Sequence, residues 1–255
     1  MKPLLYAVII LAVLISGCAA TQKNPAPNDP EQISDDINDE DFDLLEEELA
    51  EKRIEIDDPI ELLNRMMFNF NDICYFCVLK PVTQVYTNIV PKPARTGIDN
   101  FFQNLTTPLR FVSCHLQGKI ASADTELNRF LINSTVGVLG FGDPARDQHG
   151  LEPPPAEDLG QALAIHGFDN GFYIVWPILG PSTLRDSAGL AGGIFLNPVF
   201  YVDPTEVAVS ISAVKYTNKS TFHTGEYEAF KDAALDPYVA MRQAYIQYRD
   251  NQIKE

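Results

Sequence analysis

The chain has 255 residues, of which 45% are hydrophobic, and this is enough for one globular domain or a small pair. Its formal net charge is −16. So acidic a chain is a poor match for nucleic acid, because the phosphates would be repelled.

Residues 1–17 have the features of a bacterial lipoprotein signal peptide. Lys2 precedes an apolar run from Leu4 to Ile15, which is too short for a bilayer span of about 20 residues. The run ends in LISGC, with small residues before Cys18. The alternative is an ordinary signal peptide with an incidental cysteine, but this combination favours acylation of Cys18. Ala19 follows the cysteine instead of an aspartate, which predicts delivery to the outer membrane.

Residues 18–58 are predicted to be an acidic, flexible tether. Fifteen Asp or Glu residues lie between Asp29 and Asp58, against only Lys52 and Arg53. Such a segment cannot bury enough apolar surface to offset its ordering entropy. A short helix over 42–53 is the alternative, because leucines recur there at helical spacing. We interpret the segment as a spacer rather than a docking helix.

The folded part, residues 59–255, is expected to open with a long helix. Asp58 before Pro59 predicts its N-cap, and Pro81 is expected to end it about 21 residues later. Apolar residues recur at spacings of three and four from Ile60 to Cys77, and further apolar residues widen this face. Polar residues interrupt the apolar surface throughout, so a membrane span is disfavoured. We expect a helix that lies at the edge of lipid.

The rest of the chain is predicted to be mostly helical. Helices are expected over 92–105, 108–118, 122–139, 204–232 with a break near 217–225, and 236–250. Glycines and Pro144 break the helical pattern between 137 and 150, and EPPPAED is expected to be extended. Residues 159–186 mix a short helix with the β-prone FYIVW. The predicted class is mostly α.

The thiols invite a redox or zinc interpretation, which the sequence disfavours. A redox Cys-x-x-Cys pair normally starts a helix, whereas Cys74 and Cys77 lie near the predicted end of one. A zinc site with Cys114 and His115 is disfavoured because adjacent helical residues diverge by about 100°. We interpret these cysteines as small hydrophobic residues. Whether Cys114 pairs with Cys74 or Cys77 is left open.

The remaining candidates for catalysis are weak. Asp143, Asp147 and His149 share a glycine-rich loop and resemble a general acid–base set. The sequence GPSTL lacks the second glycine of a hydrolase nucleophile elbow. The histidines have no metal-ligand spacing. We therefore expect no enzyme, no metal and no cofactor other than a covalent lipid on Cys18 and the transported phospholipid.

Five ordered blocks carry a family resemblance over about 58–250. They are DPIELLNRMMFNFND, LKPVTQVYTNIVPKPARTGIDNFFQNLTTP, RFLINSTVGVLGFGDPA, EDLGQALAIHGFDNGFYIVWPILGPSTLRD and DPYVAMRQAYIQYRD. Together, behind a lipobox, they resemble the MlaA (VacJ) family of phospholipid-transport lipoproteins. The long acidic tether and the three cysteines of the folded part depart from the pattern of that family.

The resemblance implies a fold, a function and partners. The fold is a ring- or disc-like helical protein partly embedded in the outer membrane, anchored on its periplasmic side, with an amphipathic channel. The function is removal of mislocalised phospholipid from the outer leaflet, which maintains lipid asymmetry. The implied partners are phospholipid, the outer membrane, a trimeric porin of the OmpC/OmpF type and a soluble periplasmic carrier of the MlaC type. A non-transporting adaptor lipoprotein under a porin is the alternative, and a lipid hydrolase is a third class.

A lipid conduit needs an apolar wall for acyl chains and a polar lining for headgroups, and two stretches suit it. The first-helix candidates for the lipid path are Phe68, Asn69, Phe70, Asn71 and Asp72. The loop candidates are Val138, Leu139 and Phe141, with Gly137, Gly140 and Gly142 as the hinges of a mobile gate. Plain packing is the competing interpretation for each of these residues.

Overall fold

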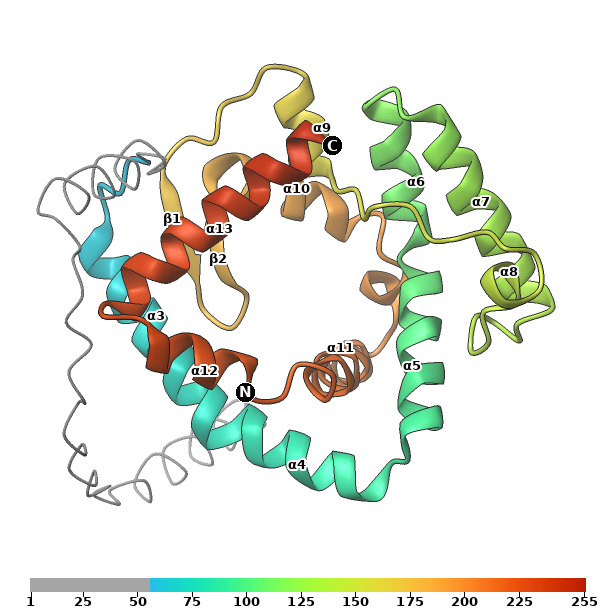
Figure 1. Ribbon diagram of the computed structural model, residues 1–255, viewed down its shortest axis with the longest axis horizontal. Coiled ribbons are helices and arrows are strands. Elements are labelled where there is room, and N and C mark those ends of the chain that lie inside the picture. The colour runs from blue at the N-terminus through green and yellow to red at the C-terminus, as the bar shows by residue number, and fades with distance from the viewer. Residues whose placement is uncertain (1–55) are drawn as a thin grey trace, which may run out of the picture. The chain divides into compact units, whose positions relative to one another are not determined.

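The computed structural model describes residues 56–255. The predicted signal peptide, Cys18 and almost all of the tether lie outside the described residues. The described part is mostly helical, as expected, and contains one two-stranded sheet (Figure 1). Its packing begins just before Pro59, because the Tyr173 backbone N–H donates a hydrogen bond to the Asp57 carbonyl over 3.0 Å.

The first helix differs from the prediction at both ends. Helix α3 (Glu61–Cys74) has Ile60 at its N-cap position without a side-chain cap. The Asp58 carboxylate instead accepts hydrogen bonds from Asn64, from the hydroxyl of Tyr238 and, over 2.8 Å, from Arg242. It therefore ties the start of the fold to the last helix.

Pro81 does not end the helix. A π turn, η1 (Tyr75–Leu79), follows α3 directly and leads into α4 (Lys80–Ile89). Proline lacks an N–H and its ring clashes with the carbonyl four residues earlier, here that of Cys77. Widening the turn relieves this clash, and Pro81 then occupies the first turn of α4, where no N–H is needed. The expectation of a helix end at Pro81 was wrong for this reason.

The middle of the chain follows the predicted pattern closely. Helices α5 (Lys92–Leu105), α6 (Thr107–Leu116) and α7 (Ile120–Thr135) precede the glycine-rich loop, and a short α8 (Pro144–Asp147) follows it. The predicted helix over 122–139 was too long at its C-terminal end, because Val138 and Leu139 are left-handed. Residues 151–158 are extended, as expected from their prolines.

A hairpin follows this extended segment. Helix α9 (Leu159–Ile165) precedes strands β1 (Tyr173–Trp176) and β2 (Gly180–Thr183), which pair antiparallel with Tyr173 opposite Thr183. Thr183 then caps α10 (Leu184–Ile194) by accepting a hydrogen bond from the Asp186 N–H. The small residues Gly160 and Gly189 let α9 and α10 approach closely, since a Cβ on Gly189 would lie 2.4 Å from the Gly160 nitrogen.

The chain ends in four helical elements. They are the 3₁₀ turn η2 (Pro198–Tyr201), α11 (Thr205–Ser220), α12 (Glu226–Ala233) and α13 (Pro237–Lys254). Asp236 caps α13, as predicted. The buried Arg249 guanidinium binds Asp186 of α10 over 2.9 Å and Asp158, the α9 cap, over 2.6 Å. Within residues 56–255 the helices thus follow one another around a central region, and α11 lies inside it (Figure 1).

Many large apolar side chains of residues 56–255 are exposed. Those with more than half of their surface exposed include Leu62, Met66, Ile73, Val85, Ile89, Leu131, Val136, Phe195, Phe200 and Val209. Extended apolar surface of this kind marks contact with a membrane or another protein. Among residues 56–255, no helix is both long and apolar enough to cross a bilayer.

Candidate functional site

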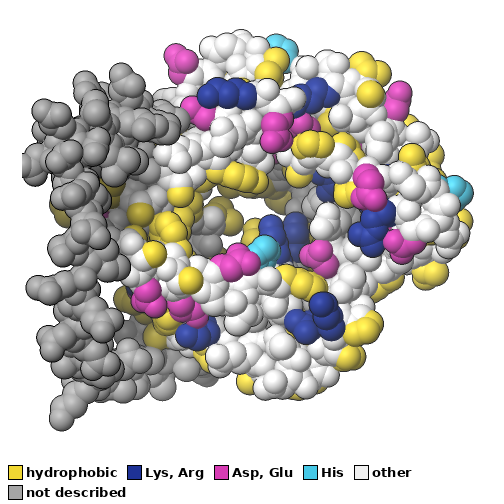
Figure 2. All heavy atoms as spheres, in the orientation of Figure 1, with side chains coloured by type: hydrophobic (Ala, Val, Ile, Leu, Met, Phe, Trp, Pro, Cys, Tyr) yellow, Lys and Arg dark blue, Asp and Glu magenta, His cyan; other side chains and the backbone are white. Residues whose placement is uncertain are grey.

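The face of the molecule seen in Figure 2 is hollowed at its centre. Hydrophobic side chains gather along the rim of this hollow, and Lys or Arg side chains lie inside it next to Asp or Glu side chains (Figure 2). An amphiphile needs this combination, because its chains require apolar contacts and its headgroup requires polar ones.

An apolar groove of about 550 Å³ lies between α5, η2 and α11. It is lined by Phe101, Phe102, Leu105, Pro198, Val199, Val202, Val207, Ser210, Ile211 and Val214. Apart from Ser210 the lining side chains are apolar, and the volume is within the range of about 300–1,000 Å³ typical of ligand pockets. The groove therefore suits a hydrocarbon chain.

A half-buried lysine follows the groove on α11. Lys215 comes directly after the groove residue Val214 and makes no ion pair or hydrogen bond with any of residues 56–255. Burial lowers the pKa of Lys215, and the charges of Lys219 and Arg110 lower it further, against an opposing effect of Asp99. Removing a cation from water without a partner is costly, so this lysine is suited to an anion such as a phosphate.

Two of the predicted lipid-path residues hold the fold together. Asn71 donates to the Trp176 carbonyl over 2.9 Å and accepts from the Ile178 N–H over 2.6 Å, so it secures the hairpin. Asp72 accepts hydrogen bonds from the Tyr227 hydroxyl over 3.0 Å and from Lys231 over 2.7 Å, which joins α3 to α12. Their part in a lipid path stays a prediction, but each has a structural role that sequence reasoning missed.

The other first-helix candidates differ in exposure. Phe68 is half-buried, and its ring lies edge-on to the Tyr238 ring with 5.9 Å between the ring centroids. Asn69 is exposed, and its side chain makes no hydrogen bond with the rest of residues 56–255. Phe70 is 37% exposed. Asn69 and Phe70 are therefore the members of this set that are available to a ligand.

The predicted gate loop, residues 137–142, has a strained backbone. Val138 and Leu139 have φ values of 53° and 58°, a left-handed conformation that costs an L-residue roughly 1–2 kcal/mol. Of the three glycines, Gly140 has a positive φ, of 92°. Strained residues persist only where the surroundings hold them in place, and they concentrate at functional sites.

The loop is held against α5. The Phe141 ring stacks on Phe101 with 5.0 Å between the ring centroids, and Asn100 donates to the Phe141 carbonyl over 3.4 Å. A Cβ added to Gly140 would lie 2.4 Å from the Cβ of Asn104. A side chain at Gly140 would therefore disturb packing whether or not the loop moves. Since Phe101 also lines the apolar groove, the loop and the groove share one wall.

Asp143, Asp147 and His149 do not form an acid–base set. Burial acts to raise the pKa of Asp143, but hydrogen bonds from Arg129 and Asn133 outweigh it and lower that pKa. Asp143 also caps α8. Asp147 and His149 are exposed, so the three do not share one enclosed site. This carboxylate is a structural anion rather than a base.

Cys74 and Cys114 have the wrong electrostatics for catalysis. Burial raises the pKa of Cys74. Burial, with a smaller contribution from Glu157 and Glu126, raises the pKa of Cys114 to about 11. A reactive cysteine needs a lowered pKa. No group of three His, Cys, Asp or Glu side chains among residues 56–255 is arranged to hold a metal ion.

The groove and Lys215 are the features that sequence reasoning missed. Val207, Ser210, Ile211 and Val214 have the spacing of one helix face, and a lysine follows immediately. The same pattern is typical of a helix face packed in a core. The sequence therefore does not identify the groove, which is recognised only from the open space beside α11 in the structure.

Comparisons with known proteins agree with this architecture. Residues 56–252 match the family model described as MlaA lipoprotein. The chain is 32% identical over 200 residues to the "Intermembrane phospholipid transport system lipoprotein MlaA" of Escherichia coli, covering 76% of this chain and 77% of that protein. It is 28% identical over 241 residues to the protein of the same name from Haemophilus influenzae, covering 94% and 86%.

A solved chain has a similar fold. It is described as "Structural basis for maintenance of bacterial outer membrane lipid asymmetry" and superposes with a TM-score of 0.65 at 28% identity. The match covers 77% of this chain and 99% of the solved chain.

Proposed function

Because the chain belongs to the MlaA lipoprotein family, we propose that it works in phospholipid transport at the bacterial outer membrane and helps to maintain lipid asymmetry there. Its relatives from two bacteria are named as lipoproteins of an intermembrane phospholipid transport system. The similar solved chain is described in terms of outer-membrane lipid asymmetry. The protein acts by binding and moving lipid, without catalysing a reaction.

The finer mechanism in this proposal has three parts. Acylated Cys18 anchors the protein on the periplasmic side of the outer membrane. Mislocalised phospholipid enters from the outer leaflet and passes through an amphipathic channel. A trimeric porin of the OmpC/OmpF type braces the protein, and a periplasmic carrier of the MlaC type receives the lipid.

The observation that supports transport is the apolar groove followed by Lys215. An acyl chain in the groove would be sheltered from water, and each buried methylene contributes about 0.8 kcal/mol. A lipid phosphate beside Lys215 would form the direct ion pair that this lysine lacks within residues 56–255. The strained loop adjoins the same wall, so its movement would change access to the groove.

A pair of substitutions on α11 tests the groove. Ser210→Trp fills it, whereas Ala213→Trp places the same bulk at an exposed position of α11 that does not line it. In cells that lack the endogenous protein, we expect Ser210→Trp to leave outer-leaflet phospholipid high at normal protein abundance. We expect Ala213→Trp to restore asymmetry. Full function of Ser210→Trp would contradict a role of the groove in transport.

The two alternative functions, a structural adaptor and a lipid hydrolase, predict different results. A structural adaptor would keep its porin association and its function in the Ser210→Trp variant. A hydrolase would release lysophospholipid or free fatty acid from labelled vesicles.

Cys18→Ser tests the lipid anchor. This variant should leave unprocessed precursor and lose function, and a mature, active Cys18→Ser protein in the outer membrane would contradict the anchor.

A further inference from the structure

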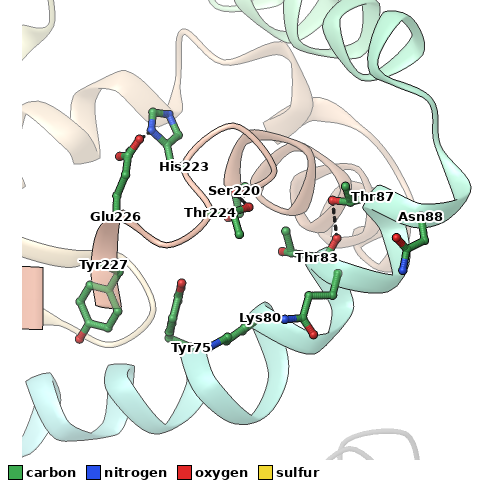
Figure 3. Close-up of a pocket in the computed structure, with 11 residues that line it drawn as sticks. Tyr75, Lys80, Thr83, Thr87, Asn88, Ser220, His223, Thr224, Glu226 and Tyr227 are labelled. Atoms are coloured by element: carbon green, nitrogen blue, oxygen red, sulfur yellow. Dashed lines mark hydrogen bonds and ion pairs between the residues drawn. The ribbon is translucent and has the colours of Figure 1, made fainter. Parts of the chain in front are cut away.

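A second pocket lies on the other side of α11, between α4 and the α11–α12 connection, with a volume of about 520 Å³ (Figure 3). It is lined by Tyr75, Lys80, Thr83, Gln84, Thr87, Asn88, Ser220, His223, Thr224, Glu226 and Tyr227. None of these residues belongs to the predicted lipid path or to the apolar groove. The pocket is therefore a separate candidate site.

The backbone at this pocket is irregular in a way that is common at functional sites. The π turn η1 begins at the pocket residue Tyr75 and ends just before the pocket residue Lys80. Single π turns inside α-helices occur frequently where a helix forms a site.

The charged groups of the pocket are already paired with one another. Lys80 binds Glu228 over 2.9 Å, and the Tyr75 hydroxyl donates to the same carboxylate over 2.7 Å. Burial and this hydrogen bond raise the pKa of Tyr75 to about 12, so its hydroxyl stays protonated. His223 and Glu226 contact each other over 3.0 Å (Figure 3). A phosphate would therefore find no unpaired lysine among these groups.

The unused hydrogen-bonding capacity belongs to neutral side chains. Thr83 is only 5% exposed, and its hydroxyl oxygen has no hydrogen-bond partner anywhere in residues 56–255. Its side chain lies at the pocket wall near Ser220 and Thr224, with the hydroxyl oxygen itself closed to solvent (Figure 3). A buried polar atom without a partner is rare in proteins and calls for an explanation, such as a ligand.

The other neutral groups complete a mixed surface. Gln84 and Asn88 have side-chain amides that make no hydrogen bond within the described chain, and each offers both a donor and an acceptor. The Thr87 and Ser220 hydroxyls donate to main-chain carbonyls over 2.7 Å and 2.9 Å, so their lone pairs remain available as acceptors. A hydroxyl group, which both donates and accepts, matches these neutral groups better than a phosphate, which mainly accepts.

We propose that this pocket binds a neutral polyol, and specifically the glycerol headgroup of a phosphatidylglycerol-type phospholipid. The Gln84 and Asn88 amides would bind the diol, and the Thr83 hydroxyl would join them after its side chain rotates toward the pocket. The Tyr75 and Tyr227 rings, 4.6 Å apart between centroids, would cover its C–H face. The phosphate would stay outside the pocket. This assignment rests on the proposed function, since it names the lipid class that the protein prefers.

The test uses Thr83→Val with Thr135→Val as its control. Both substitutions remove a hydroxyl from a helix, but the Thr135 hydroxyl donates to the Leu131 carbonyl and does not line the pocket. The Thr83 hydroxyl has no partner to lose, so we expect its variant to remain folded. The full lipidated protein in detergent would be titrated calorimetrically with glycerophosphoglycerol and with glycerophosphoethanolamine.

The wild type should bind glycerophosphoglycerol at least about fivefold more tightly than glycerophosphoethanolamine, and Thr83→Val should remove about fivefold of that affinity, the effect of one neutral hydrogen bond. Thr135→Val should change neither affinity. Equal binding of the two headgroups, or unchanged binding by folded Thr83→Val, would overturn the assignment.

Vesicles separate this inference from the proposed function and from a free polyol as the ligand. Labelled phosphatidylglycerol should leave mixed vesicles faster than labelled phosphatidylethanolamine in the presence of the wild type. Transfer of both lipids at one rate would overturn the headgroup assignment while leaving the transport function standing. Binding of glycerophosphoglycerol without transfer of any lipid would contradict the transport function and assign the pocket to a free polyol.

Discussion

Replacing Val138 by glycine tests whether the loop at 137–142 stores conformational energy. Val138 is β-branched, has a φ of 53° and is 68% exposed, so it is strained and buries little surface. The left-handed conformation costs an L-residue roughly 1–2 kcal/mol. Glycine removes this cost but loses about 0.5–1 kcal/mol more conformational entropy on folding. Val138→Gly should therefore be as stable as the wild type or more stable, by up to about 1 kcal/mol.

Val136→Gly is the matched control. Val136 is also an exposed valine, 62% accessible, but its φ of −70° is helical and unstrained. Glycine there relieves nothing and should cost the same entropy loss of about 0.5–1 kcal/mol. The two variants should differ by roughly 1–2 kcal/mol in the free energy of unfolding. Urea unfolding of both in one detergent, followed by circular dichroism, gives this difference.

The outcome bears on gating as well as on strain. If Val138→Gly is destabilised as much as Val136→Gly, the valine is not strained and the argument fails. If the strain biases the loop between two states, relieving it should also change lipid flux at unchanged protein abundance. A more stable Val138→Gly protein with unaltered flux would separate the strain from the function.

Three further predictions concern stability. Asn71→Leu should cost roughly 1–2 kcal/mol, because two main-chain groups of the hairpin exchange their partner for water, and thermal unfolding should show it. Asp143 and Asp186 have lowered pKa values, so their stabilisation should be complete above the unfolded value near ~3.9 and lost as pH falls through the folded values. Asp186→Asn should flatten that acid-side loss in a pH series of unfolding curves. Cys74→Ala with Cys77→Ala should lower stability but leave transport by folded protein intact, and a folded, inactive double variant would revive redox chemistry.

The local sequence pattern was sufficient to predict most of the helices. The apolar periodicity of residues 92–105 and the Asp236–Pro237 start of α13 correspond to elements in the structure. The resemblance to the MlaA family, taken from five blocks, is confirmed by the family match over 56–252 and by the similar solved chain. These signals are short-range, because periodicity and capping act within a few residues.

The errors arose where a distant partner or an irregular helical turn decides the outcome. Asp58 has the sequence context of an N-cap, but Tyr238 and Arg242, about 180 residues later, take its carboxylate. Pro81 has the context of a helix end, but a π turn relieves its clash and the helix continues. A single sequence shows neither the returning helix nor the wider turn.

The same logic separates the polar residues of α3. Asn69, Asn71 and Asp72 interrupt one apolar stretch and look equivalent in sequence. The fold uses Asn71 for the hairpin and Asp72 for α12, and leaves Asn69 unpaired within residues 56–255. Polar side chains that already have hydrogen-bond partners within the fold need no ligand to explain their presence.

Features that the fold leaves unsatisfied are a better guide to function, because each has a cost that nothing else in the described chain offsets. Two of them lie on or beside α11, and a third lies in the loop at 137–142. Lys215 is half-buried without an ion pair in residues 56–255, the Thr83 hydroxyl is buried without a partner, and Val138 is strained in a loop that shares the wall of the apolar groove. A phosphate, a headgroup diol and a second loop position would respectively relieve these three costs. If a phospholipid is the ligand, its phosphate and its headgroup would supply the first two, and its passage would give the loop a reason to move.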